Sequence, residues 1–191
     1  MPRNLLLSAK VLVILLALSV WTSCSMILGL LGKSSEEQVV TMRTTKGKIV
    51  IELYPDTAPV AVGNFKKLVK KRFYYGLTFH RRVNNESLNI VQGGDPNGDG
   101  TGGPGYTIID EYTLPNQRPH LRGTVAMART NAPNSAGSQF YICLKPQPHL
   151  DGRYTTFGRV IQGMDVVDLL EIGDSMKTVR LEVKSKYVKP Q

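Results

Sequence analysis

Two short stretches are the most informative part of the sequence, because each places a glutamine inside a run of strand-forming residues. Residues 89–94 read Asn-Ile-Val-Gln-Gly-Gly, and residues 137–144 read Gly-Ser-Gln-Phe-Tyr-Ile-Cys-Leu. A third stretch, Phe79-His80-Arg81, sets an arginine of buried type in a similar context, and such an arginine needs a functional reason. No nucleophile, metal-ligand cluster or cofactor loop accompanies these side chains in the sequence. The pattern therefore indicates chemistry in which no covalent bond is made or broken.

Around these stretches, the period-two alternation of apolar side chains predicts a protein made mainly of β-strands. In residues 48–54, Ile49, Ile51 and Leu53 alternate with other side chains, which is typical of a half-buried strand. This segment and the run at 39–43 predict a hairpin. Strand-like runs also occur at residues 77–82, 89–92, 123–128, 140–144, 155–160 and 178–188. Many short strands and glycine-rich turns favour a closed antiparallel barrel over an open sheet.

Two helices are expected beside the strands. Residues 55–59, Pro-Asp-Thr-Ala-Pro, open the first helix, with Thr57 as its N-cap and Pro59 in its first turn, where proline is tolerated. The apolar stripe of this helix consists of Val62, Phe65, Leu68 and Val69. The second helix is predicted over residues 164–172. The chain of 191 residues therefore suits one mainly β domain with a proper core.

Much of the net charge of +9 is concentrated on the first of these helices. Lys66, Lys67, Lys70, Lys71 and Arg72 lie together there, without interleaved aromatic side chains that could stack on bases. We interpret this run as a solvated helix face, with a modest attraction to an anionic membrane surface. We therefore expect no nucleic-acid partner, and we expect the protein to be a monomer.

The first 32 residues differ in composition from the rest of the chain. Basic residues precede an apolar run over 11–21 and small residues follow it, which is typical of an export signal. Cys24 is a candidate for lipidation, because it follows small residues as in a bacterial lipobox. The apolar stretch at 26–31 leaves an uncleaved membrane anchor open. We expect a signal peptide or anchor at 1–32, a linker at 33–38 and the domain at 39–190, exported to the periplasmic or lumenal side of a membrane.

Several motifs in the glycine-rich segment and elsewhere are incomplete. Gly98-x-Gly100-x-x-Gly103 fits a dinucleotide-binding pattern, but Pro104 follows where a helix should begin. Asp95-x-Asn97-x-Asp99 begins like a calcium loop, yet Tyr106 stands where the bidentate glutamate is required. The three histidines lack metal-ligand spacing, and Cys143 reads as a small core residue. We therefore expect a turn-rich loop here, and neither a metal nor a cofactor.

The remaining motifs resemble the cyclophilin family of peptidyl-prolyl isomerases. The matching segments lie at residues 76–81, 91–96, 100–106, 126–129, 134–140, 149–153 and 157–160. They occur in the family's order and span residues 39–188. The resemblance implies an eight-stranded antiparallel barrel capped by two α-helices, and an enzyme that rotates prolyl peptide bonds.

The resemblance also implies how Arg81 and Gln92 act. Amide resonance sets a barrier of about 18–20 kcal/mol to rotation about a prolyl bond. A catalyst must favour the twisted state, in which the prolyl nitrogen regains its lone pair. Arg81 matches the family's catalytic arginine, whose donors suit the substrate carbonyl and that lone pair. Gln92 matches the glutamine that binds the substrate backbone and helps to hold the arginine.

The other positions implied by the resemblance form the substrate-binding surface. They are Ile90, Ala128, Arg129, Gln139, Tyr141, His149, Leu150 and Tyr154. The sequence departs from the common pattern between Arg81 and Gln92, where it is about three residues longer, so the family's pocket phenylalanine becomes Asn89, or Leu88 if the register slips. His149 stands where many members have tryptophan.

From these residues we expect a peptidyl-prolyl cis-trans isomerase that assists protein folding by acting on proline-containing segments of exported clients. The altered segment between residues 84 and 90 leaves a second hypothesis open, in which the domain is a weakly active or non-catalytic module that binds proline peptides as a chaperone. Both hypotheses use the same surface residues.

Overall fold

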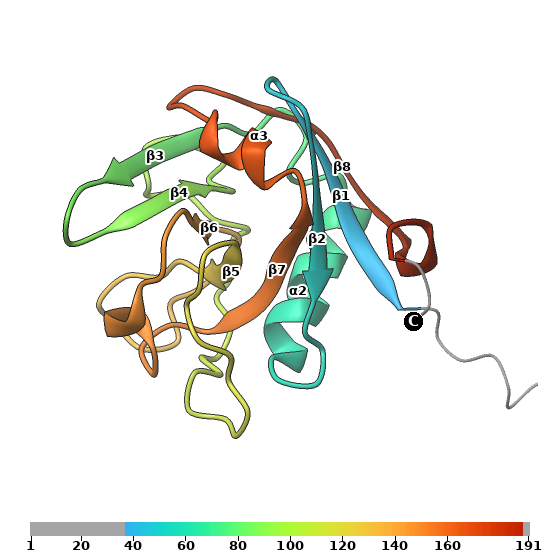
Figure 1. The fold of residues 1–191 in the computed structure, drawn as a ribbon. Coiled ribbons are helices and arrows are strands. Elements are labelled where there is room, and N and C mark those ends of the chain that lie inside the picture. The colour runs from blue at the N-terminus through green and yellow to red at the C-terminus, as the bar shows by residue number, and fades with distance from the viewer. Residues whose placement is uncertain (1–36, 189–191) are drawn as a thin grey trace, which may run out of the picture. The chain divides into compact units, whose positions relative to one another are not determined.

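The structure, a computed structural model, describes residues 37–188. The predicted export segment, Cys24 and most of the predicted linker lie outside the described residues. The described chain contains eight antiparallel strands and the α-helices α2 and α3 (Figure 1), so the mainly β class is confirmed. The strands are β1 (Gln38–Thr44), β2 (Lys48–Leu53), β3 (Phe79–Asn84), β4 (Asn89–Gly93), β5 (Thr124–Met127), β6 (Phe140–Cys143), β7 (Thr156–Gln162) and β8 (Met176–Val183). The helices are α2 (Pro59–Lys70) and α3 (Met164–Asp168), with short 3₁₀ turns η1 (Pro148–Leu150) and η2 (Lys184–Lys186).

The sheet is an open half-barrel, and the prediction of a closed barrel is wrong. The strand order β3-β4-β6-β5-β7-β2-β1-β8 leaves β3 and β8 as its two edges. These edges meet only through the isolated bridge between Thr78 and Ser175 and the backbone hydrogen bonds around it. Farther along β3, Arg82 donates instead to the main-chain oxygens of Asp168 and Leu170. The segment at α3 therefore occupies the place where a continuous ladder between β3 and β8 would run.

The main core lies between the sheet and α2, which covers one of its faces (Figure 1). Phe65 of α2 is fully buried and packs against Tyr74, Phe140 and Phe157, with ring centroids 4.9, 5.6 and 5.1 Å away. Tilted and edge-to-face contacts of this kind add to the hydrophobic gain of burying the rings. The apolar stripe predicted for the first helix is thus the surface that holds α2 to the sheet.

The N-terminus of α2 is held by a distant carboxylate rather than by the predicted cap. Thr57 makes its side-chain hydrogen bond to the carbonyl of Tyr54. Instead, the carboxylate of Glu111 accepts the backbone N–H groups of Val60 and Ala61, both at 2.9 Å. Glu111 is only 2% exposed, and a negative charge at a helix N-terminus is favourable. A residue far along the chain thereby replaces the local cap, and no local pattern could reveal it.

The C-terminal elements are shorter than predicted. The second helix ends at Asp168 rather than at residue 172, and Leu169 and Ile172 beyond it are 60% and 66% exposed. Arg82 satisfies carbonyl groups that the ended helix leaves free. The last strand ends at Val183, where η2 begins. Within residues 37–188, no helix is long and apolar enough to cross a bilayer.

A second apolar cluster lies on the opposite face of β4, β5 and β6. Its buried members are Ile90, Ala126, Ala128, Tyr141 and Cys143. Their neighbours along the same strands, such as Val91 and Ile142, belong to the main core. Because successive side chains of a strand point to opposite faces, the same three strands serve both clusters.

Replacing Glu111 with alanine should lower the free energy of unfolding by about 2 kcal/mol, because two backbone donors at the N-terminus of α2 lose a charged acceptor. Urea denaturation measures this change. Glu86→Ala, at the exposed tip of the β3–β4 hairpin, is the matched control and should leave the midpoint unchanged. Equal midpoints for the two variants would show that Glu111 does not stabilise α2.

Candidate active site

Arg81, Gln92 and Gln139 form a continuous chain of side-chain hydrogen bonds. Nη1 of Arg81 donates to Oε1 of Gln92 at 3.1 Å, and Nε2 of Gln92 donates to Oε1 of Gln139 at 2.9 Å. Nε2 of Gln139 then donates to the carbonyl oxygens of Gly100 and Gly102, both at 2.9 Å. Each amide accepts on one side and donates on the other. The guanidinium is therefore fixed by a relay that ends in the backbone of the glycine-rich loop.

The sheet register places the members of this relay on one face. Arg81 lies opposite Gln92 in the β3–β4 pair, and Gln92 lies opposite Tyr141 in the β4–β6 pair. The β3–β4 register shifts between Phe79 and Arg81, and bulges of this kind re-aim a side chain at the edge of a sheet. Arg81 itself is exposed, so the expectation of a buried arginine is wrong: it lies on an edge strand, at the mouth of a cavity.

An apolar cavity of about 130 Å³ opens beside the guanidinium. It is lined by Arg81, Leu88, Ile90, Gln92, Ala128, Arg129, Tyr141, Leu150 and Tyr154. A cavity of about 150 Å³ holds a benzene molecule, so this one is of the right size for a single small ring. Polar donors thus lie on one side of the cavity and apolar walls on the others.

Leu88, and not Asn89, contributes to this cavity. Asn84 pairs with Asn89 across the hairpin, which leaves a four-residue turn over 85–88. The side chain of Asn85 accepts the backbone N–H groups of Ser87 and Leu88 and so fixes the turn. Asn89 is buried and donates to the carbonyl of Asn85 at 2.6 Å. The longer segment between Arg81 and Gln92 therefore still supplies an apolar side chain at the cavity.

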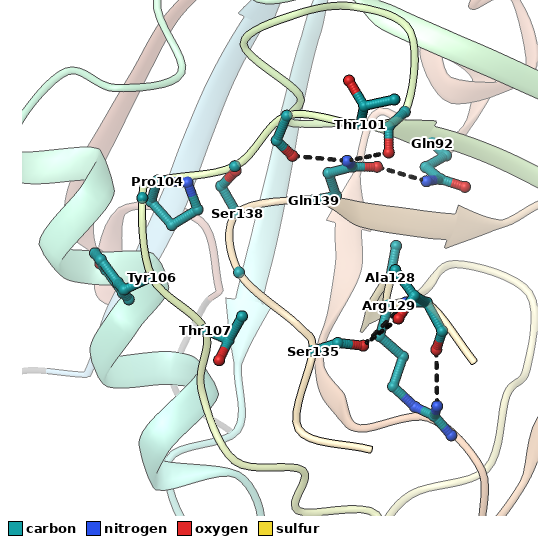
Figure 2. Close-up of a pocket in the computed structure, with 16 residues that line it drawn as sticks. Gln92, Thr101, Pro104, Tyr106, Thr107, Ala128, Arg129, Ser135, Ser138 and Gln139 are labelled. Carbon is teal, nitrogen blue, oxygen red and sulfur yellow. Dashed lines mark hydrogen bonds between the residues drawn. The ribbon is translucent and has the colours of Figure 1, made fainter. Parts of the chain in front are cut away.

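A second and larger cavity of about 450 Å³ lies on the other side of Gln139 (Figure 2). The glycine-rich loop over residues 100–107 forms one wall, and residues 128–130 and 135–139 form the other. The loop is organised by the buried carboxylate of Asp95, which accepts the backbone N–H groups of Asn97, Asp99 and Gly100. A turn-rich loop was predicted here, and residues 100–106 belong to the segments that resemble the cyclophilin family, but no residue of the loop was predicted to line the site. The available signal was an aspartate followed by turn residues, which is typical of a side chain that caps its own loop.

Arg129 borders both cavities, but its guanidinium points away from Gln139 (Figure 2). It donates to the carbonyl oxygens of Thr130 and Arg153, both at 2.9 Å, and lies 5.0 Å from the ring centroid of Tyr154. Its side chain therefore ties together two loops at the rim of the site.

The structure brings the other predicted site residues together, with one exception. Ile90, Ala128, Tyr141, Leu150 and Tyr154 line the smaller cavity, beside Arg81 and Gln92, and Gln139 lies between the two cavities. His149 is exposed on η1 and lines neither cavity.

Two residues that were not predicted as part of the site, His120 and Asp151, are linked to the cavity residue Tyr141. The hydroxyl of Tyr141 lies 2.9 Å from Nε2 of His120, and Nδ1 of His120 lies 2.7 Å from the carboxylate of Asp151. Burial lowers the pKa of His120 below its ordinary value, and Asp151 partly opposes this effect. The available signal was Tyr141 itself, because a tyrosine hydroxyl in a buried strand needs a polar partner.

The one thiol of the described chain is no nucleophile. Cys143 is fully buried on β6, and burial raises its pKa to about 12. It therefore stays protonated at neutral pH and serves as packing. The chemistry available at the site is consequently hydrogen bonding from a fixed guanidinium next to an apolar cavity.

Comparison with known proteins agrees with this geometry. Residues 39–188 match the family described as "Cyclophilin type peptidyl-prolyl cis-trans isomerase/CLD", and the chain belongs to this family. It is 48% identical over 135 residues to peptidyl-prolyl cis-trans isomerase B of Bacillus subtilis, covering 71% of this chain and 91% of that protein. It is 43% identical over 141 residues to a peptidyl-prolyl cis-trans isomerase of Helicobacter pylori, covering 73% and 83%.

A solved structure shows the same fold. The crystal structure of a Cryptosporidium parvum cyclophilin type peptidyl-prolyl cis-trans isomerase, determined in the presence of the dipeptide Ala-Pro, superposes with a TM-score of 0.68 at 31% identity. The superposition covers 75% of this chain and 98% of that one. The chain is accordingly a peptidyl-prolyl cis-trans isomerase of the cyclophilin type.

Replacing Gln139 with leucine keeps its bulk but removes its hydrogen bonds to Gln92 and to the glycine-rich loop, and leaves the bond between Arg81 and Gln92 in place. Backbone amides of residues 97–103 should then exchange with solvent about tenfold faster, because the loop loses two hydrogen bonds from the sheet. Hydrogen-exchange NMR measures these rates. Gln162→Leu, which removes a single hydrogen bond to Tyr187 elsewhere, should leave them unchanged. Unaltered exchange in Gln139→Leu would show that Gln139 does not hold the loop.

Proposed function

We propose that this protein accelerates rotation about X-Pro bonds in unfolded or loop segments of exported proteins and so assists their folding. The observation that supports this most directly is the relay that ends in Arg81 beside the apolar cavity. Ring binding and hydrogen-bond donation are the two tasks that the reaction requires, and the site offers both at one place.

The reaction follows from differential binding of the twisted peptide bond. In the cis or trans ground state the prolyl nitrogen shares its lone pair with the carbonyl group, and this resonance produces a barrier of about 18–20 kcal/mol. When the bond is rotated out of plane, the lone pair returns to the nitrogen, which can then accept a hydrogen bond. The guanidinium of Arg81 has donors for that nitrogen or for the preceding carbonyl oxygen. A donor that gains its acceptor only in the twisted state lowers the barrier without a covalent intermediate.

The relay makes this donation effective by fixing the guanidinium beforehand. An arginine on an exposed edge strand would otherwise sample many rotamers, and ordering it at each turnover would cost entropy. Gln92 accepts one of its N–H groups, which leaves the remaining donors for substrate. The apolar walls, among them Ile90, Leu150 and Tyr154, exclude water from the bound ring and strengthen the hydrogen bond.

The central test is Arg81→Ala, assayed by NMR exchange spectroscopy on an X-Pro peptide. Loss of a single preorganised donor should lower kcat/KM by about 100- to 1,000-fold. Arg159→Ala is the matched control, because Arg159 pairs with Glu52 and lines neither cavity; its rate should equal that of the wild type. A wild-type rate no higher than that of Arg81→Ala would contradict catalysis.

The same experiment separates the second candidate function. A non-catalytic proline-peptide binding or chaperone module would bind the peptide with measurable affinity and leave its exchange at the uncatalysed rate. This function was considered because the altered segment over residues 84–90 lacks the family's pocket phenylalanine. Leu88 lines the cavity in its place, which favours the catalytic function.

Export and membrane association are part of the proposal and rest on residues 1–32 of the sequence. Export predicts that protease added to spheroplasts degrades the domain, whereas protection would contradict it. Mass spectrometry of the mature N-terminus then distinguishes a lipidated Cys24, a cleaved signal peptide and an uncleaved anchor. Cys24→Ser is the control, since it removes only the lipidated form.

A further inference from the structure

His120 joins the segments that build the proline-sized cavity, although it is no part of the cavity lining. It is 1% exposed. Its backbone N–H donates to the carboxylate of Asp151 at 2.8 Å, and its carbonyl accepts the backbone N–H of Gln147 at 2.7 Å. Its ring bonds Asp151 through Nδ1 and Tyr141 through Nε2. The partners of His120 therefore lie on β6 and on the loop over 147–154, which together carry three cavity walls.

The chemistry of the partners fixes the tautomer of His120. A carboxylate only accepts hydrogen bonds, so Nδ1 must carry the ring proton and donate it to Asp151. Nε2 is then free to accept the hydroxyl proton of Tyr141. The order of donors is thus Tyr141 to His120, and His120 to Asp151.

This order determines where the Tyr141 hydroxyl points. The rings of His120 and Tyr141 are nearly parallel, with an interplanar angle of 14°, and Tyr141 meets Tyr154 edge-to-face at 84°. With its hydroxyl bound to His120, Tyr141 presents only its ring to the cavity. Without that acceptor, a buried hydroxyl is left unpaired at appreciable cost, or it turns toward the apolar cavity.

From this geometry, and given the proposed isomerase function, we propose that His120 is a positioning residue. Its imidazole, oriented by Asp151, accepts the hydroxyl proton of Tyr141 and holds the hydroxyl away from the proline cavity; we call this contact the latch. The latch keeps the rings of Tyr141 and Tyr154 in the positions that the substrate ring requires.

The latch is sensitive to protonation. Imidazolium donates from both ring nitrogens, so protonated His120 can no longer accept from Tyr141. The other titratable or charged groups that face the side chains of His120 and Tyr141 are Asp151, His149, Cys143, Tyr154 and Arg129. Burial lowers the pKa of His120, so the neutral, latched form is favoured above the ordinary value of about 6.5, and the latch is lost only as pH falls below that value.

The test measures kcat, KM and the dissociation constant of an X-Pro peptide by NMR for His120→Leu, His120→Gln and Tyr141→Phe. His120→Leu should weaken peptide binding and raise KM about tenfold, the effect of one lost buried hydrogen bond, with a smaller change in kcat. His120→Gln, which retains an acceptor, should recover part of the loss. Tyr141→Phe keeps the ring but has no hydroxyl to hold. Adding His120→Leu to this variant should therefore change its KM and its dissociation constant little.

Acidification provides a readout that a merely structural role would not change. Wild-type KM should rise as pH falls below about 6.5, whereas Tyr141→Phe should show a flat profile. The ¹⁵N shifts of the His120 ring should report a protonated Nδ1 and an unprotonated Nε2 at pH 7.5. Tyr75→Phe is the matched control, because it removes a phenol hydroxyl that accepts from Arg180 at a separate surface.

A failure of the latch can be distinguished from a failure of the proposed isomerase function. If the wild type gives only the uncatalysed rate, the isomerase proposal fails, while the dissociation constants still test the latch. Wild-type affinity in His120→Leu, or identical pH profiles with and without the Tyr141 hydroxyl, would overturn the latch. If His120→Leu does not fold, His120→Gln and Tyr141→Phe decide the matter alone.

Discussion

The antiparallel pairing of β4 with β6 is the constraint on which the rest of the structure depends. Val91 lies opposite Ile142, and Gln92 lies opposite Tyr141. The first pair faces the core under α2, and the second faces the site. A slip of β4 by one residue would exchange its faces, turning Gln92 toward the core and Val91 toward the site. The large cost of that exchange pins the register, and the register in turn brings Arg81, Gln92 and Tyr141 together.

The polar relay costs little free energy of folding because it lies at the rim of the sheet and ends in backbone carbonyls. A buried amide without partners costs free energy, but the bonds from Arg81 to Gln92, from Gln92 to Gln139, and from Gln139 to the loop satisfy the polar atoms in turn. The glycine-rich loop is itself held by Asp95. Two separate anchors therefore meet at Gln139, one from the sheet and one from the loop.

The sequence could predict what depends on local periodicity and composition, and little that depends on distant partners. Residues 48–54, 178–188 and the stripe of α2 followed from alternation and amphipathicity, because burial on one face imposes those periods. The other strands were predicted as strand-like apolar runs, and β4, β5 and β6 are buried along their whole length. The hydrogen bonds from Glu111 to the start of α2 and those between His120 and Tyr141 could not be predicted from local patterns, since each joins residues that are far apart in the chain. Closure of the barrel was wrong for the same reason: whether β3 meets β8 or the segment at α3 depends on Arg82 and on carbonyls that a shortened helix leaves free.

Both sides of the cavity are held by contacts that lie outside the hairpin turn over residues 84–89. The polar side is fixed through β4 and the glycine-rich loop. The aromatic side is fixed through Tyr141, His120 and the loop that carries Leu150 and Tyr154. The hairpin over residues 84–89 contributes Leu88 to the lining but makes none of those connections. Its length can therefore change without moving the guanidinium relative to the ring-binding walls, because the distance between them is set by Gln92 and Tyr141, which lie opposite each other in the sheet.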